Sequence, residues 1–376
     1  MTNKNLNILI GTAVVLGVAA YFVGSGSKPS APKLNGKAIL PDLNAADVAR
    51  IEIGGKLTLA AGDKGWVVET LHGYPASRDK IAENLLKLTE LKVGQVARGR
   101  KLGAETAVTL KDASGKAVAE LKLGDTHSKK ATGQAAMYGG GGYPDGRYLE
   151  FSGETVLVKD TLDAFDGDAK KWCETRIASI PSSDVTAVSY SQGKELVELE
   201  KGTNSTWVLK GLGPKEELDT SKTYSLDSAL SYLDFTGVAD PKKTDAELGF
   251  ATGAVYTVTL KNGQSYTAKV GDKTGSDRWV KLSASFKAVG TNATENATLE
   301  KAVKDFNEKT GKWAFSISSY SADNMSKTRK DLVKAKEEPK KDEAKKDDKK
   351  PETAPKAAPA KPAAKKAEPK KDTPKK

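Results

Sequence analysis

The sequence predicts an α+β protein built from two tandem repeats, each a curved and mostly antiparallel sheet covered by one or two helices. The first observation is that the same order of signals occurs twice, over residues 45–183 and again over residues 184–333. Self-similarity on this scale sets the architecture before any single motif is considered. The second is that short runs alternate polar and apolar residues, which is typical of strands with one buried face. The third is that each repeat contains one segment whose leucines are spaced as on a helix face.

The strands of the first repeat are expected around two turns. Residues 50–53 and 56–59 alternate polar and apolar side chains across Gly54-Gly55, the pattern of a tight hairpin. Residues 66–68 supply a third strand, and residues 112–115 form the turn between two more. The second repeat follows the same plan, with the strong hairpin signal Asn262-Gly263 in the corresponding place.

One leucine-spaced helix is expected to cover the sheet of each repeat. In both, a serine N-cap precedes an apolar stripe that recurs at intervals of three and four residues. A second, shorter helix is predicted at residues 160–171 and at residues 298–309. The two stripes are Ile81, Leu85 and Leu88 after Ser77, and Leu226, Leu230 and Leu233 after Ser225.

The tryptophans and the single cysteine are interpreted as core residues. Trp66 and Trp207 hold equivalent places in the two repeats, as do Trp172 and Trp313, and this recurrence favours packing over ligand stacking. Cys173 is the only cysteine, so no internal disulfide can form and the fold must depend on core packing. Beside Trp172 it is expected to be a small buried residue rather than a reactive thiol.

A Gly-Asp pair stands at the end of the hairpin of each repeat, in Gly124-Asp125-Thr126 and Gly271-Asp272-Lys273-Thr274. A phosphate-binding loop would need an upstream glycine at a fixed spacing and a helix after the run, and the sequence has neither. Each pair is therefore predicted to be a turn in which the aspartate accepts backbone N–H groups.

The N-terminus differs in composition from the body. Residues 8–24 carry no charge and are long enough, at the short limit, to cross a bilayer once. Residues 1–24 are predicted to be a transmembrane anchor, with a cleaved signal segment as the alternative, and residues 25–44 a flexible linker rich in Gly, Ser, Pro and Lys. Either alternative places the body outside the cytoplasmic membrane, in the periplasm.

Residues 334–376 contain only Lys, Ala, Pro, Asp, Glu and Thr and are predicted to be a disordered tail. The tail has 16 Lys against 9 acidic residues, so it contributes +7 of the net charge of +11 and leaves the rest of the chain at +4. Such a modest charge, without a nucleic-acid-binding motif, gives no reason to expect a specific nucleic-acid site. The tail could contact an anionic envelope polymer, or it could serve only as a solvated segment.

No constellation in the sequence reaches the specificity of a catalytic, cofactor or metal site. His72 and His127 fall in different predicted loops, without neighbouring cysteines or a triad pattern. The glycine run at residues 139–142 lacks a dinucleotide-binding spacing and is predicted to be a flexible loop. The tyrosines on either side of it, Tyr138 and Tyr143, make this loop a candidate interaction site.

The order of these elements resembles that of a bacterial envelope family known as domain of unknown function 4340. The resemblance rests on the apolar N-terminal segment, the tryptophan hairpin, the Tyr74-Pro75-Ala76 entry to the first helix, the Gly-Asp runs and the strand at Arg147-Tyr148-Leu149. It implies a similar fold and a membrane anchor. It also implies an auxiliary role, because some members look like components encoded with ABC-type export systems, and it provides no catalytic residues to carry over. The glycine-rich segment at residues 131–146 and the long tail depart from the family pattern.

These observations lead to one functional hypothesis and two alternatives. The first is a non-enzymatic, single-pass protein of the cytoplasmic membrane whose body acts as an auxiliary or scaffold subunit, with the subunits of an ABC-type transporter as partners and no cofactor. The second is a module that binds cell-wall or surface polymer through the basic tail. The third is an enzyme acting on an envelope polymer.

Overall fold

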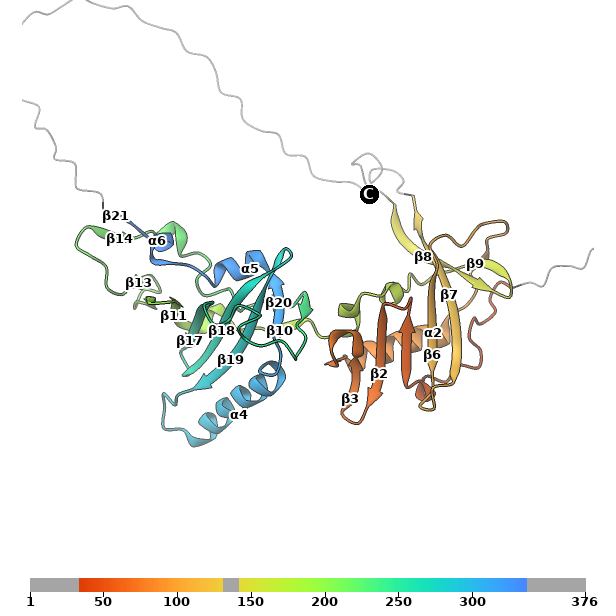
Figure 1. Cartoon of the computed structure of the whole chain (residues 1–376), viewed down its shortest axis with the longest axis horizontal. Helices are drawn as coiled ribbons and strands as arrows, with labels where there is room; N and C mark the ends of the chain where they lie inside the picture. Colours follow the sequence, from red (N-terminus) through yellow and green to blue (C-terminus); the bar gives the residue numbers. More distant parts are fainter. Residues whose placement is uncertain (1–33, 131–141, 337–376) are drawn as a thin grey trace, which may run out of the picture. The chain divides into compact units, whose positions relative to one another are not determined.

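The structure is a computed structural model that describes residues 34–130 and 142–336 of the chain. Two large sheets, accompanied by a few helices, make up most of this part (Figure 1). Every strand pair among the described residues is antiparallel, so the predicted α+β class with mostly antiparallel sheets is confirmed.

The first sheet has nine strands in the order β4-β3-β2-β1-β6-β7-β8-β9-β5. Gly54 and Gly55 connect β1 to β2, and both have positive φ angles, +58° and +65°, as the tight turns of hairpins require. The hairpin expected from the sequence is therefore present. The strands are β1 (Arg50–Ile53), β2 (Leu57–Gly62), β3 (Gly65–Val68), β4 (Tyr74–Pro75), β5 (Gln95–Val96), β6 (Thr106–Lys111), β7 (Ala117–Lys129), β8 (Tyr143–Phe151) and β9 (Glu154–Val158).

The second sheet has eight strands in the order β13-β12-β11-β17-β18-β19-β20-β16. Read across the sheet from β13 to β16, these strands hold the same positions as β3-β2-β1-β6-β7-β8-β9-β5 of the first sheet. Two short pairs, β10 with β15 and β14 with β21, lie outside the large sheets. The strands are β10 (Arg176–Ala178), β11 (Val185–Gln192), β12 (Glu195–Lys201), β13 (Trp207–Leu209), β14 (Glu216–Leu218), β15 (Leu233–Asp234), β16 (Gly237–Val238), β17 (Ala254–Leu260), β18 (Gln264–Thr274), β19 (Asp277–Phe286), β20 (Phe315–Ser318) and β21 (Val333–Ala335).

Helix α2 (Arg78–Glu90) follows Ser77 and buries the predicted stripe, so the first leucine-spaced helix is confirmed. The expected helix at residues 298–309 is also present, within the longer α4 (Ala293–Thr310). Asn307 fixes α4 to β19, because its side-chain amide exchanges two hydrogen bonds, of 2.7 and 2.8 Å, with the backbone of Ala284. Figure 1 shows α4 lying along β19. The remaining helices are α5 (Ser319–Asn324) and α6 (Arg329–Leu332), with 3-10 turns η1 (Ala45–Asp47), η2 (Glu69–Leu71), η5 (Ser182–Asp184) and η6 (Thr220–Lys222).

The second leucine-spaced helix was predicted wrongly, because residues 224–232 form a series of turns. Backbone N–H groups there reach back three residues, as from Ser231 to Ser228 at 3.0 Å. The Tyr256 hydroxyl donates to the Leu226 carbonyl, which a regular helix would have used internally. Serine hydroxyls also compete for backbone groups, and this lowers helix propensity. The apolar stripe is nevertheless buried, since Leu226, Leu230 and Leu233 are at most 1% exposed.

The short helix expected at residues 160–171 was also predicted wrongly. The chain instead forms two 3-10 turns, η3 (Asp163–Asp166) and η4 (Ala169–Trp172), separated by Gly167 with a φ of +89°. A left-handed residue interrupts a right-handed helix, so the segment divides there. Trp172 is fully buried as expected, and its indole N–H donates to the Ala164 carbonyl at 2.9 Å.

The end of the predicted linker belongs to the folded body. Leu34 and Ile39 are buried, at 6% and 5% exposure. The Ile39 N–H donates to the Leu91 carbonyl at 2.9 Å, and the Val93 N–H donates to the Lys37 carbonyl at the same distance. The Gly, Ser and Pro content of residues 25–44 concealed these two apolar anchors, so the linker prediction fails for residues 34–44.

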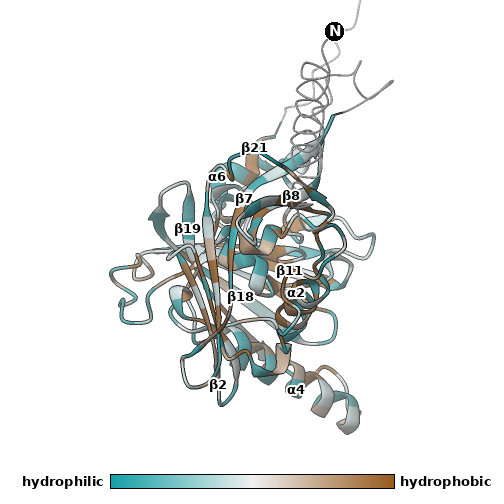
Figure 2. Cartoon of the chain, turned by 90° about the vertical axis from the view of Figure 1, so that its right-hand side faces the viewer, coloured by the Kyte–Doolittle hydropathy of each residue, from teal (hydrophilic) through white to brown (hydrophobic). Residues whose placement is uncertain are grey.

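One continuous apolar core includes residues from both large sheets. At their junction the ring of Tyr74, on β4, makes edge contacts with Phe235 and Trp313 at centroid distances of 5.1 Å and with Phe315 at 5.9 Å. In Figure 2 hydrophobic colours run along the strands and near α2. Packed aromatic contacts of this kind resist independent motion of the two sheets.

Several predictions concern parts of the chain outside the described residues. These are the anchor or signal segment at residues 1–24, the tail beyond residue 336, and Tyr138 in the glycine-rich loop. None of the helices in residues 34–130 and 142–336 has the length and apolar character needed to cross a membrane.

Candidate interaction site

The Gly-Asp pairs lie inside long strands, so the predicted turns are wrong. In β7, Leu123 pairs with Leu149 and Thr126 with Arg147, which sets two residues, Gly124 and Asp125, against one. This is a β-bulge, which bends a strand and changes the direction of its side chains. Glycine and aspartate are common in both turns and bulges. Here the pairing of β8 with residues on both sides of Gly124-Asp125 makes the pair a bulge.

Glycine is required in the bulge because another segment of the chain passes very close. A Cβ atom on Gly124 would lie 2.1 Å from the Leu102 carbonyl oxygen. That carbonyl accepts the Asp125 N–H at 3.1 Å, and the Asp125 carboxylate accepts the Ala104 N–H at 3.1 Å. The expected role of the aspartate as a backbone acceptor is thus confirmed at Asp125, although its setting is a bulge.

Arg147 secures the bulge from the neighbouring strand β8. Its side chain is only 5% exposed, and its Nε donates to the Gly124 carbonyl at 2.9 Å. Its Nη1 contacts the Thr161 carbonyl at 3.5 Å and forms an ion pair with Asp166. A buried guanidinium needs such partners, because an unpaired buried charge is costly.

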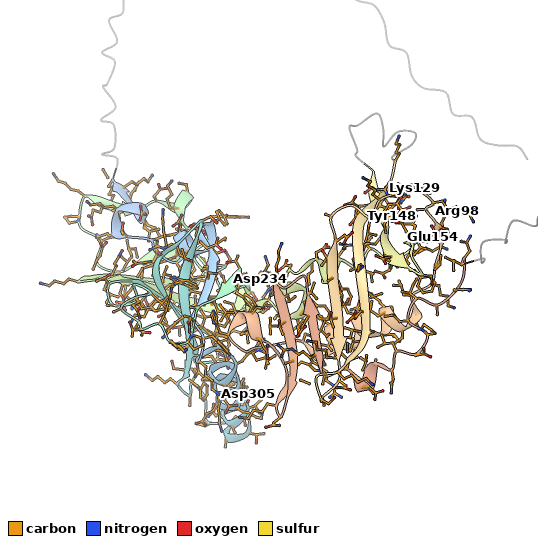
Figure 3. The ribbon with its side chains drawn as sticks, turned by 45° about the vertical axis from the view of Figure 1, so that its right-hand side comes forward. Arg98, Lys129, Tyr148, Glu154, Asp234 and Asp305 are labelled. Carbon is orange, nitrogen blue, oxygen red and sulfur yellow. The ribbon has the colours of Figure 1, made fainter. Side chains whose placement is uncertain are left out.

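Tyr148, the next residue of β8, lies between two polar side chains. The Arg100 guanidinium carbon is 3.9 Å from the centre of the Tyr148 ring, and the His127 ring meets it edge-on at 5.7 Å. The Arg100 Nη2 atom also lies 3.9 Å from the Asp125 carboxylate. Figure 3 shows Tyr148 at the same end of the first sheet as Lys129, Arg98 and Glu154. The bulge therefore orients a stack of arginine, tyrosine and histidine at this end.

His127 belongs to β7 rather than to a loop, and its Nδ1 atom contacts the carboxylate of Asp145. Both side chains are about one-third exposed, at 33% and 32%. A histidine oriented by a carboxylate is two-thirds of a hydrolytic triad. Among the described residues, however, no hydroxyl or thiol hydrogen-bonds to His127, and Ser128 faces the opposite side of the strand. The Asp145 carboxylate therefore holds the His127 ring in a partly exposed position, where the ring could contact a partner.

Tyr143 begins β8 and pairs with Lys129 on β7. Its side chain is 57% exposed, so the structure places this predicted residue where a partner could reach it. It lies on the same hairpin as His127 and Asp145, two residues before Asp145. We call Tyr143, His127, Asp145, Tyr148 and Arg100 the β7–β8 site.

Sequence reasoning found Tyr143 and missed the other four residues. Arg100 follows β5 and Tyr148 lies on β8, and the two meet because both strands pair with β9. His127 has neither neighbouring cysteines nor a triad pattern in the sequence to mark it as a site residue. Residues 126–128 are all polar, so no alternation of polar and apolar residues indicates that β7 continues past the Gly-Asp pair.

Cys173 is fully buried, and burial raises the pKa of its thiol to about 12. Such a thiol is not a nucleophile at neutral pH, which agrees with the interpretation as a core residue. In the described part of the chain, no three histidine, cysteine, aspartate or glutamate side chains converge in an arrangement suited to a metal ion.

Comparison with known proteins identifies the family. Residues 66–252 match the family model described as Domain of unknown function (DUF4340). The chain belongs to the DUF4340 family. The resemblance noted in the sequence is thereby confirmed, and the match begins at Trp66 of β3 and ends just after Phe250, so it crosses from the first sheet into the second. No curated protein and no solved structure shows significant similarity to this DUF4340 member.

Proposed function

We propose that this DUF4340 protein is a non-enzymatic, membrane-anchored envelope protein whose body lies on the extracytoplasmic side and serves as an auxiliary or scaffold subunit of an ABC-type transport system. The β7–β8 site carries the proposal. Protein interfaces are enriched in aromatic and arginine anchors held in fixed positions. Here Tyr148, only 8% exposed, is held between Arg100 and His127, and Tyr143 is exposed at the start of the same strand.

The continuous core supports a scaffold role. The contacts of Tyr74 with Phe235, Trp313 and Phe315 join the two sheets through apolar packing rather than through a flexible connection. A body of this kind keeps a binding site at a fixed place, which lowers the entropy lost when a partner docks.

We also propose that the body arose by tandem duplication. Support comes from the corresponding strand order and from a detail repeated in both sheets. In β18, Gly271 and Asp272 form a second bulge opposite Trp279, and a Cβ on Gly271 would lie 2.1 Å from the Leu248 carbonyl. Arg278 donates to the Gly271 carbonyl at 3.0 and 3.2 Å, as Arg147 does to Gly124.

The proposal is tested by crosslinking the full-length protein in cells, extracting it gently with detergent and identifying its partners by mass spectrometry. Recovery of a transporter permease and ATPase is expected, and Tyr143→Ala should reduce it. Tyr224→Ala is the matched control, because Tyr224 is an exposed tyrosine of the second half, at 95% exposure. Neither substitution removes core packing, so folding is expected to be unaffected.

A tail truncation separates the polymer-binding alternative. The deletion should remove residues 337–376 only, because Val333–Ala335 form β21 and pair with β14. Transporter partners should remain after this deletion. Recovery of wall or surface polymer alone, and its loss on truncation, would favour the polymer-binding module instead.

A further inference from the structure

A polar cavity of about 680 Å³ lies at one end of the second sheet. It is lined by the last residue of β11, Gln192, the first of β17, Ala254, and Arg278 of β19. Two segments, residues 219–222 and 323–333, complete the wall. The volume falls within the usual range for small-molecule sites, about 300–1,000 Å³. It is separate from the β7–β8 site, which is built on the first sheet.

Four cationic side chains from different elements line this cavity: Lys222, Arg278, Lys327 and Lys330. The Nε and Nη2 atoms of Arg278 donate to the Gly271 carbonyl, so Nη1 is the guanidinium nitrogen that this carbonyl does not use. Within residues 34–130 and 142–336, the ammonium groups of Lys222, Lys327 and Lys330 form no ion pair with a carboxylate. The cavity therefore gathers four cationic side chains from η6, β19 and the segment around α6.

Three carboxylates also line the cavity, and they define the other part of the ligand. Asp219 accepts the Ser221 N–H and hydroxyl at 3.0 and 2.6 Å, and Asp331 accepts those of Thr328 at 2.7 and 2.8 Å. These hydrogen bonds lower the pKa of both carboxyls and keep them ionised. The carboxylate of Asp323 accepts no hydrogen bond from any described residue and is exposed. A bare anion would meet repulsion from these groups, whereas a ligand that also carries hydroxyl groups would donate to them.

We propose that this cavity binds a phosphoryl group carried on a hydroxyl-bearing small molecule, such as a phosphorylated polyol or a lipid headgroup of the same chemistry. Lysines act as point charges toward phosphoryl oxygens, and three of them with Arg278 can surround a tetrahedral phosphoryl group. Asp323 and Gln192 then accept hydrogen bonds from the hydroxyl groups. This inference is independent of the partner proposed for the β7–β8 site.

The test is isothermal titration calorimetry of the full-length protein in detergent. The ligands are glycerol 3-phosphate, glycerol, inorganic phosphate and dihexanoyl-phosphatidylglycerol, a short-chain lipid with the same headgroup. The variants Lys222→Ala and Lys330→Ala are each expected to weaken binding of glycerol 3-phosphate about tenfold, the usual effect of losing one charge-assisted hydrogen bond. Both lysines are exposed, so their loss should leave thermal unfolding unchanged.

Lys287→Ala is the matched control. Lys287 is an exposed lysine that follows β19 at the end opposite Arg278. The substitution removes one positive charge away from the cavity and leaves the lysines of the tail unchanged. Lys222→Arg should restore binding. Tight binding of glycerol 3-phosphate that depends on the cavity lysines supports a free phosphate ester as the ligand. Lysine-dependent binding of the short-chain lipid alone supports a lipid headgroup as the ligand. The inference is overturned if neither glycerol 3-phosphate nor the short-chain lipid binds, or if glycerol binds as tightly as glycerol 3-phosphate. It is also overturned if Lys222→Ala and Lys330→Ala bind glycerol 3-phosphate as tightly as Lys287→Ala does.

Discussion

Replacing Gly103 with alanine should destabilise the protein by an amount that the structure divides into two parts. Gly103 has a φ of +86°, where an alanine costs about 1–2 kcal/mol. The new Cβ would also lie 2.1 Å from Oδ2 and 2.3 Å from Cγ of Asp125. The carboxylate must move away, which breaks its 3.1 Å hydrogen bond from the Ala104 N–H. Losing a partly exposed hydrogen bond to a charged group adds about 1.5 kcal/mol.

Gly115→Ala is the matched control, because Gly115 has the same φ of +86° and no atom lies within 4 Å of its Cβ position. Urea denaturation should therefore show a loss of about 1–2 kcal/mol for Gly115→Ala and about 3 kcal/mol for Gly103→Ala. In a double-mutant cycle, adding Asp125→Ala to Gly103→Ala should add almost nothing further. Equal losses for the two glycine variants would refute the close approach of Asp125 to the Leu102–Gly103 segment.

Three further predictions concern the core and its charges. Tyr74→Ala should lower the free energy of unfolding by about 3–5 kcal/mol in urea denaturation, whereas Tyr74→Phe, which keeps the ring, should cost less than about 1 kcal/mol; similar values would contradict the packing at the junction. Hydrogen bonds from Lys111 and Arg50 lower the pKa of Glu52. The ionised carboxyl therefore stabilises the folded state above the pKa of the unfolded state, about 4.3, and this stabilisation is lost as the pH falls through the lower folded pKa. Glu52→Gln should therefore reduce the difference in stability between pH 7 and pH 3, and an unchanged difference would argue against these contacts. Cys173, with its buried thiol, should react with a thiol reagent at pH 8 only as the protein unfolds, and fast reaction of the native protein would contradict its burial.

The elements that were predicted correctly are those specified by local signals. Gly54-Gly55 fixed the first hairpin, and the stripe from Ile81 to Leu88 fixed α2 because Glu, Leu and Lys favour a helix there. The stripe at Leu226, Leu230 and Leu233 has the same spacing but forms turns, since the hydroxyl of Tyr256, distant in the sequence, takes the Leu226 carbonyl. Spacing alone predicts which residues are buried, and it does not determine the backbone conformation that buries them.

The β7–β8 site was only partly predictable. An exposed tyrosine next to a glycine run is a local feature, and Tyr143 was found from it. The stack of Arg100 on Tyr148 depends on long-range pairing, which no periodicity reports. The cavity lysines could not be predicted as a site either. Lys222 and Lys330 come from segments more than a hundred residues apart and line one cavity only because of the fold.

The central claim is that the β7–β8 site contacts a subunit of a membrane transporter. The most direct test is a photo-crosslinking amino acid placed at position 143 in the full-length protein in cells, with the same amino acid at position 224 as the control. Both positions hold exposed tyrosines, so neither replacement should disturb the core. The account predicts that a transporter permease or ATPase is captured from position 143 and not from position 224. Equal capture from both positions, or no transporter subunit from position 143, would contradict it.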